Sequence, residues 1–240
     1  MINSRRCVAL CCLVVMIWTH LAVAGEIHDV RYSFQGGNFK AKVLIPDGNG
    51  PFPVIIYNYD QYYDWAGPVL AARRGYDLDT IMTEMSQWGY AVIIPLERYR
   101  KLSAIKGSIV YCKTQPELRA DNIHLVGVAE GAFMSLLCLP DYPEIRSLCF
   151  VAPESIHDSG KLSLAQVLRD APKVNTPILF VMATNDKTWK VRMAKFMYRV
   201  LNQSHQEMRL KEYDADRAWF FSADNIFMED IHAFISKHTR

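Results

Sequence analysis

A short turn near the middle of the chain has the spacing of a chemical site. Apolar residues run into Gly127, and Gly131 follows four positions later, where a helical pattern begins. A hydroxyl or thiol between these two glycines would be a nucleophile suited to acyl transfer. The residue at that place is Ala129, and its methyl group has neither a lone pair nor a proton to lose. The turn therefore has the spacing of a site without the reactive atom.

Ionisable residues elsewhere are candidates for a different catalytic constellation. They are Asp60, Glu130, Asp186 and His157. His157 follows a predicted strand and is expected at the same edge of the sheet as Ala129. No nucleophile is paired with it, so a loop position without a catalytic role is the simpler interpretation. Without a histidine to orient, Asp186 is interpreted as a carboxylate that caps a loop.

The elements that must position these residues alternate along the chain. A hairpin turn is expected at Gly36-Gly37, followed by buried strands at 54–57, 90–95, 122–127, 148–152, 177–183 and 208–213. Helices are expected at 78–88, 132–140, 193–201 and 227–235, with one short helix within 102–121. This alternation implies an α/β fold with a mostly parallel, twisted sheet of about eight strands covered by helices on both faces. The stretch 154–176 is too short for a large cap domain.

Several sequence landmarks occur in an order that resembles one enzyme family. They are Pro51-Phe52-Pro53-Val54-Ile55-Ile56-Tyr57-Asn58, Trp88-Gly89-Tyr90-Ala91-Val92-Ile93-Ile94-Pro95, the turn from Gly127 to Gly131, and Thr176-Pro177-Ile178-Leu179-Phe180-Val181. In this order the chain resembles α/β hydrolases of the dienelactone-hydrolase type over nearly all of residues 25–240. The resemblance implies the α/β-hydrolase fold and, for the family, hydrolysis of esters or lactones.

The resemblance also implies where a catalytic triad would lie, in the order nucleophile, acid, histidine. The nucleophile position falls at Ala129, the acid at Asp186, and the histidine at Ala218 in the turn Asp214–Phe220. No histidine occurs anywhere in that turn. Two of the three family groups are therefore absent from the sequence.

The loop after the strand at 54–57 departs from the family as well. Asn58-Tyr59-Asp60 stands where the family commonly has a His-Gly pair. The backbone N–H of Glu130 and one near Tyr59 or Asp60 would form the oxyanion hole, but an inward Asp60 carboxylate would repel a developing oxyanion. Five large rings between Tyr57 and Trp65 are equally consistent with ligand contact and with packing over the sheet edge. The predicted ligand pocket contains Tyr59, Asp60, Trp65, Glu130, His157 and Trp219.

The first 24 residues have the composition of a secretory signal peptide. Arg5 and Arg6 precede an apolar core, and small residues end the segment, so cleavage is expected after Ala24. Residues 25–240 are then expected to be a single domain that is secreted or periplasmic. No membrane contact is expected once the leader is removed.

Composition excludes several function classes. The 240 residues are 50% hydrophobic, enough for one substantial core, and the formal net charge is only +2. Because no basic run is interleaved with aromatics, no nucleic-acid partner is expected. Cys112, Cys138 and Cys149 of the mature chain can form at most one disulfide and lack metal-type spacing, so neither a metal nor another cofactor is expected.

The preferred hypothesis is a non-catalytic relative of the hydrolases that binds a small ester, lactone or carboxylate, or else a protein partner. Loss of nucleophile and base together argues for natural decay of the site. One alternative is an active esterase or lactonase that uses a non-standard constellation. Another is a structural scaffold without a pocket function. The turn Asp214–Phe220 discriminates among them, because a working hydrolase needs a base there.

Overall fold

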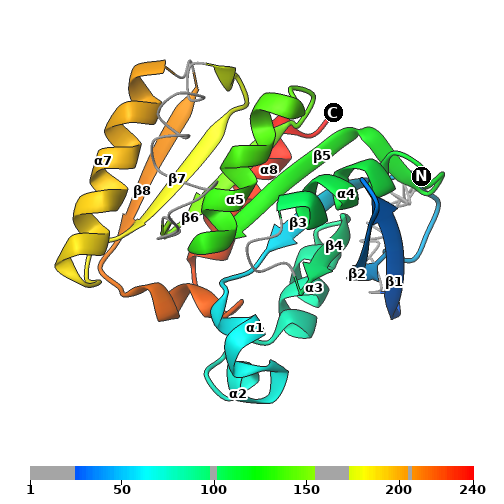
Figure 1. Cartoon of the computed structure of the whole chain (residues 1–240), viewed down its shortest axis with the longest axis horizontal. Helices are drawn as coiled ribbons and strands as arrows, with labels where there is room; N and C mark the ends of the chain where they lie inside the picture. Colours follow the sequence, from blue (N-terminus) through cyan, green and yellow to red (C-terminus); the bar gives the residue numbers. More distant parts are fainter. Residues whose placement is uncertain (1–24, 98–101, 155–172, 205–206) are drawn as a thin grey trace, which may run out of the picture.

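One eight-stranded sheet organises the chain (Figure 1). The computed structural model describes residues 25–97, 102–154, 173–204 and 207–240, so the predicted leader and His157 lie outside the described residues. The strands are β1 (Ile27–Phe34), β2 (Gly37–Leu44), β3 (Phe52–Asn58), β4 (Ala91–Leu96), β5 (Leu118–Val128), β6 (Ser147–Val151), β7 (Ile178–Ala183) and β8 (Met208–Tyr213).

The strand order is β1-β2-β4-β3-β5-β6-β7-β8. The opening hairpin joins the sheet through antiparallel pairing of β2 with β4, and every later pairing is parallel. At the hairpin turn, Gln35 and Gly36 both have positive φ, which explains the glycine there. The predicted mostly parallel sheet with an N-terminal hairpin is confirmed.

Helices cover both faces of the sheet. One face packs against α4 (Leu102–Cys112), α5 (Glu130–Cys138) and α7 (Thr188–Ser204), and the other against α3 (Leu78–Gln87) and α8 (Phe227–His238). All nine residues of α5 are buried, which is why its sequence is apolar on every side. None of the described segments forms a cap domain. No helix in the described part of the chain is long and apolar enough to cross a membrane.

Two local predictions are corrected. The aromatic stretch after β3, expected as a loop, contains two short helices, α1 (Tyr62–Ala66) and α2 (Pro68–Ala72), which project from the body of the fold (Figure 1). The strand before the Gly127 turn begins at Leu118, earlier than the predicted start at 122. Leu118 pairs with Phe52 of β3, so partner-strand hydrogen bonding extends β5 through polar residues that have no strand periodicity.

The turn between β5 and α5 depends on its two glycines for steric reasons. A Cβ on Gly131 would lie 2.1 Å from the Asn58 carbonyl oxygen, and one on Gly127 would lie 2.4 Å from Cα of Ala132. Both distances are far inside van der Waals contact. The glycines therefore bring helix α5 against the end of β3, whatever residue occupies position 129.

All three cysteines of the described chain are free and buried. Burial raises the pKa of each thiol, that of Cys138 to about 12, so none is a thiolate at neutral pH. Because no disulfide joins them, packing of the apolar core stabilises the fold.

His124 is fully buried in β5, away from the Gly127 turn, and holds the C-terminal end of the chain. Its Nδ1 lies 2.8 Å from the Ser147 hydroxyl and its Nε2 3.2 Å from Oγ1 of Thr239. The Thr239 hydroxyl donates to the Ile235 carbonyl and also contacts the hydroxyl of Tyr90 at 2.6 Å. Since that hydroxyl has one proton to donate, Nε2 of the imidazole is the donor and Nδ1 accepts from Ser147.

Acid should weaken the fold through His124. Burial lowers the pKa of its imidazole to about 3, and the positive charges of His238 and Arg146 add to the shift. The side chain of the unfolded protein titrates near pH 6.5, so the neutral imidazole makes its full contribution to the free energy of unfolding above that pH. Below it, this free energy falls by ~1.4 kcal/mol for each pH unit as the pH drops towards 3. Urea unfolding of wild type and His124→Asn between pH 7.5 and 4 measures this. The variant should be less stable at pH 7.5 but less sensitive to acid; equal pH dependence would contradict the assignment.

Candidate functional site

The turn at Ala129 has the backbone of a catalytic elbow. Ala129 has φ 53° and ψ −115°, a conformation that non-glycine residues rarely adopt. Its N–H donates to the Val151 carbonyl at 2.9 Å, and its own carbonyl accepts from the N–H of Glu154 at 3.2 Å. The side chain is fully buried. Neighbouring strands thus hold the backbone in the strained geometry, and the group presented there is a methyl.

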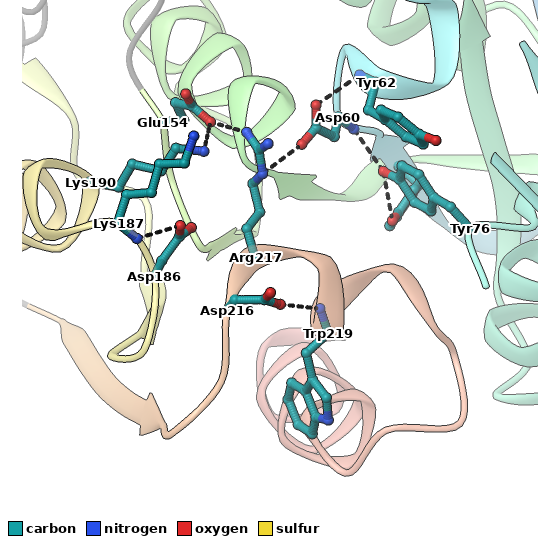
Figure 2. Close-up of polar contacts among 11 residues, drawn as sticks. Asp60, Tyr62, Tyr76, Glu154, Asp186, Lys187, Lys190, Asp216, Arg217 and Trp219 are labelled. Carbon is teal, nitrogen blue, oxygen red and sulfur yellow. Dashed lines mark hydrogen bonds and ion pairs between the residues drawn. The ribbon is translucent and has the colours of Figure 1, made fainter. Parts of the chain in front are cut away.

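Ala218, at the position where the resemblance places the catalytic histidine, contributes no functional group to the site, but the neighbouring Arg217 does. Ala218 is exposed on the short helix η3 (Arg217–Phe221). Asp216 caps this helix by accepting the N–H of Trp219 at 3.1 Å. Arg217, the first residue after this cap, points towards Asp60 and Glu154 at the carboxyl edge of the sheet (Figure 2).

Arg217 bridges two carboxylates from different strands (Figure 2). Its Nε lies 3.2 Å from Oδ2 of Asp60, after β3, and its Nη1 pairs with Oε2 of Glu154, after β6. Lys190, in the first turn of α7, reaches the same Glu154 oxygen at 2.9 Å. Two cations and two carboxylates therefore form a continuous chain, here called the edge network: Lys190, Glu154, Arg217 and Asp60.

Three of the four charged side chains of this network are largely removed from water, so their charges need compensation within the protein. The Asp60 side chain is only 1% exposed, and Glu154 and Lys190 are 13% and 11% exposed. A carboxylate so far from water needs opposite charge and hydrogen-bond donors. Asp60 has both, because its Oδ1 accepts the N–H of Tyr62 at 2.8 Å and its Oδ2 faces Arg217.

One expected oxyanion donor is occupied within the protein. The backbone N–H of Asp60 donates to the hydroxyl of Tyr76 at 2.7 Å. Tyr76 is itself buried, stacks on Phe221 with ring centroids 4.1 Å apart, and has its hydroxyl 3.4 Å from that of Tyr57. Burial raises the pKa of Tyr76 well above its ordinary value, with smaller contributions from Tyr57 and Asp60, so the hydroxyl stays protonated.

Asp186 lies in the loop after β7 and remains apart from the edge network. Its Oδ1 accepts the N–H of the following residue, Lys187, at 2.6 Å (Figure 2). No histidine contacts this carboxylate within the described residues. Among those residues no group of three or more His, Cys, Asp or Glu side chains could hold a metal ion.

A cavity of about 440 Å³ opens beside the edge network. Asp60 and Arg217 form one side, and Trp65 and Tyr62 of α1 supply aromatic surface. Trp65 is 83% exposed, so its ring is available to a bound molecule. The full lining is Asp60, Gln61, Tyr62, Asp64, Trp65 and Arg217.

The structure gathers only part of the predicted pocket around this cavity. Asp60 and Trp65 line it, whereas Tyr59 is buried, donates to Asp64 at 2.6 Å and lines a separate groove of about 600 Å³. Trp219 points away from Arg217 and packs on Tyr213, Phe220 and Phe227 (Figure 2). Glu130 is buried in α5 and, like Ala129, is not among the cavity lining. His157 lies outside the described residues.

Sequence analysis missed Arg217, Glu154 and Lys190, the residues that fill the carboxyl edge. A signal for them was present. Charges of opposite sign follow β3, β6 and β8, and the carboxyl ends of parallel strands meet at one edge of a sheet. In the turn Asp214–Phe220 the charged group is the guanidinium of Arg217, next to Ala218.

Arg217→Ala should destabilise the protein by about 3 kcal/mol, since it leaves the buried Asp60 carboxylate without its countercharge. The double variant Asp60→Asn/Arg217→Met should recover much of that loss, because the Asp60 charge is removed together with its partner and Glu154 keeps its ion pair with Lys190. Lys40→Ala, which breaks the exposed pair with Glu97, is the matched control and should cost less than ~1 kcal/mol. Urea unfolding at pH 7 gives all three values. Equal losses for Arg217→Ala and Lys40→Ala would contradict a structural role for the network.

Known proteins agree with the architecture. A model of the dienelactone hydrolase family matches residues 96–237. An esterase from Pyrococcus furiosus superposes with a TM-score of 0.68 at 14% identity, covering 90% of this chain and 94% of its own. An esterase domain from Rhodothermus marinus superposes with a TM-score of 0.66 at 14% identity, covering 89% of this chain and 99% of its own.

A candidate dienelactone hydrolase from Klebsiella pneumoniae covers 89% of this chain and 100% of its own, with a TM-score of 0.63 at 16% identity. At such low identity these structures establish the α/β-hydrolase fold alone. A search of curated protein sequences gave no match. Because the family model matches more than half of the chain, the protein belongs to the dienelactone hydrolase family.

Proposed function

We propose that this chain is a non-catalytic member of the dienelactone hydrolase family that binds a small ligand at the carboxyl edge of its sheet. The observation that carries the proposal is the side chain at the elbow, the buried methyl group of Ala129. A methyl group cannot form the covalent intermediate on which acyl transfer in this fold depends.

The charged side chain next to the family's histidine position supports the same conclusion. Arg217, beside Ala218 in the Asp214–Phe220 turn, pairs with Asp60 and Glu154, and a guanidinium stays protonated throughout the physiological range. It therefore cannot accept a proton from a serine, a water or any other nucleophile. The backbone N–H of Asp60 donates a hydrogen bond to the Tyr76 hydroxyl, so this donor is not available to stabilise an oxyanion.

The cavity beside the network suits a small molecule with an apolar body and one polar end. Its volume of about 440 Å³ is in the range that holds drug-sized ligands. Trp65 and Tyr62 offer aromatic surface, and two of the five guanidinium N–H groups of Arg217 are directed at Asp60 and Glu154. The remaining donors would bind an ester, lactone or carboxylate oxygen. We propose this ligand class, held in the secreted or periplasmic compartment.

A protein partner is the second candidate, and one observation favours it. The projecting helices α1 and α2 expose Trp65, Val69 and Leu70 at 83%, 66% and 51%. Three neighbouring apolar side chains in contact with water are typical of a protein contact surface.

Purified protein should hydrolyse short p-nitrophenyl esters no faster than buffer alone, and His28→Ala, a control that removes an exposed histidine far from the elbow, should give the same rate. Ala129→Ser should not restore activity, because Ala218 occupies the position where the family has its histidine and the neighbouring Arg217 cannot accept a proton. Initial rates over a range of substrate concentrations test both statements. Saturable turnover by the wild type that is lost in Glu130→Gln or His157→Ala would favour an active hydrolase with a non-standard constellation.

A thermal-shift screen of small carboxylates, lactones and esters should give a ligand that stabilises the wild type. At a concentration 100 times its Kd, such a ligand adds ~2.7 kcal/mol to the free energy of unfolding. Trp65→Ala should reduce the shift, whereas Trp189→Ala, which truncates an exposed tryptophan on α7, should leave it unchanged. Equal shifts in both variants would place the ligand elsewhere. If no compound of these classes stabilises the protein, the small-ligand proposal fails.

A further inference from the structure

The outward face of α7 concentrates positive charge. This helix of 17 residues contains Lys190, Arg192, Lys195 and Arg199 and no acidic residue. Lys190 turns inward to Glu154, whereas the other three are exposed and make no ion pair within the described residues. The whole chain has a formal net charge of only +2, so the rest of the sequence is net negative. The outward face of α7 thus carries a local excess of positive charge.

Two aromatic side chains share this face. Trp189 and Phe196, seven residues apart, are 42% and 37% exposed. Their spacing of about two turns places them on the same side of the helix, among the three exposed cations. The opposite side, with Ala194, Met197 and Leu201, is buried against the sheet. The buried aliphatic side of α7 packs on the sheet, and of the two aromatics Trp189 also has the Lys190 ammonium 5.5 Å from its ring centroid.

We propose that this face of α7 docks on the surface of an anionic lipid bilayer. Guanidinium and ammonium groups would lie at the level of the lipid phosphates, while Trp189 and Phe196 enter the interfacial region that aromatic side chains prefer. The charge complementarity is strong, because each cation near an anionic leaflet raises partitioning by about fivefold.

The shape of the face distinguishes a bilayer from other anionic partners. Arg192, Lys195, Phe196 and Arg199 lie along the outside of a single helix, and the principal cavities of the described structure include none of them. A peptide or a nucleic-acid strand is usually held in a groove, whereas an extended flat surface can meet a convex row of side chains. The sequence alone predicted no membrane contact after removal of the leader. The exposure of this helix face is the structural observation that supports such contact.

Co-sedimentation with vesicles tests the proposal on the chain from Gly25 onward, which keeps every described element and omits the apolar leader. The wild type should bind vesicles in which about a third of the lipid is phosphatidylglycerol, but not vesicles of phosphatidylcholine alone. Binding should weaken as salt is added. Arg192→Gln/Arg199→Gln should lower the partition coefficient roughly 25-fold, from two cations at about fivefold each.

The matched control is Arg31→Gln/Arg73→Gln, which removes the same charge from exposed positions on β1 and beside α2. It should bind as the wild type does, and Trp189→Ser should bind more weakly. Thermal melting checks that each variant folds. If Arg192→Gln/Arg199→Gln does not fold, Lys195→Glu replaces it in the binding measurement. Equal losses in the two double variants would mean diffuse charge attraction and would overturn the proposal. Absence of wild-type binding at low salt would also overturn it.

Discussion

The ion pair between Arg217 and Asp60 is the interaction on which the carboxyl edge of this sheet depends. Asp60 is almost completely removed from water, and a carboxylate in that environment is tolerated only beside opposite charge. The pair joins the loop after β3 to the turn after β8, which lie far apart in the strand order. Glu154 extends the link to β6 and to Lys190 of α7. Four elements are held together where the fold places its catalytic groups.

Backbone constraints at the turn explain how the elbow can persist around a side chain that has no chemistry. Gly127 and Gly131 are required because Cβ atoms would collide with backbone, and the hydrogen bonds of Ala129 to β6 and its following loop fix the strained φ and ψ. These constraints are steric and local to the backbone, so they do not depend on a nucleophile. The fold and the family are therefore kept. The proposed loss of catalysis rests on the side chains of Ala129 and Arg217 and on the Asp60 N–H that is hydrogen-bonded to Tyr76.

Charge also separates the two binding surfaces that we propose. At the cavity beside α1, the cation Arg217 is compensated by Asp60 and Glu154, so recognition there would rest on aromatic surface and a few directed donors. On α7 the exposed cations have no such compensation within the described residues, and attraction there would be long-ranged and sensitive to salt. Lys190 of α7 joins the edge network through Glu154, but no described residue belongs to both surfaces.

The sequence by itself determined the order of the strands and of the long helices, the hairpin at Gly36, and the absence of a hydroxyl, thiol or imidazole at Ala129 and Ala218. These follow from hydrophobic periodicity, glycine chemistry and residue identity, all of which are local. It did not determine that Arg217 would turn inward while Trp219 packs outward, or that the Asp60 N–H would bond to Tyr76. Which side chains meet at the sheet edge is decided by the pairing of β3, β5 and β6 and by the cap at Asp216. The physical reason is that a buried charge selects its partner by position in space, and only the folded chain brings residues 60, 154, 190 and 217 together.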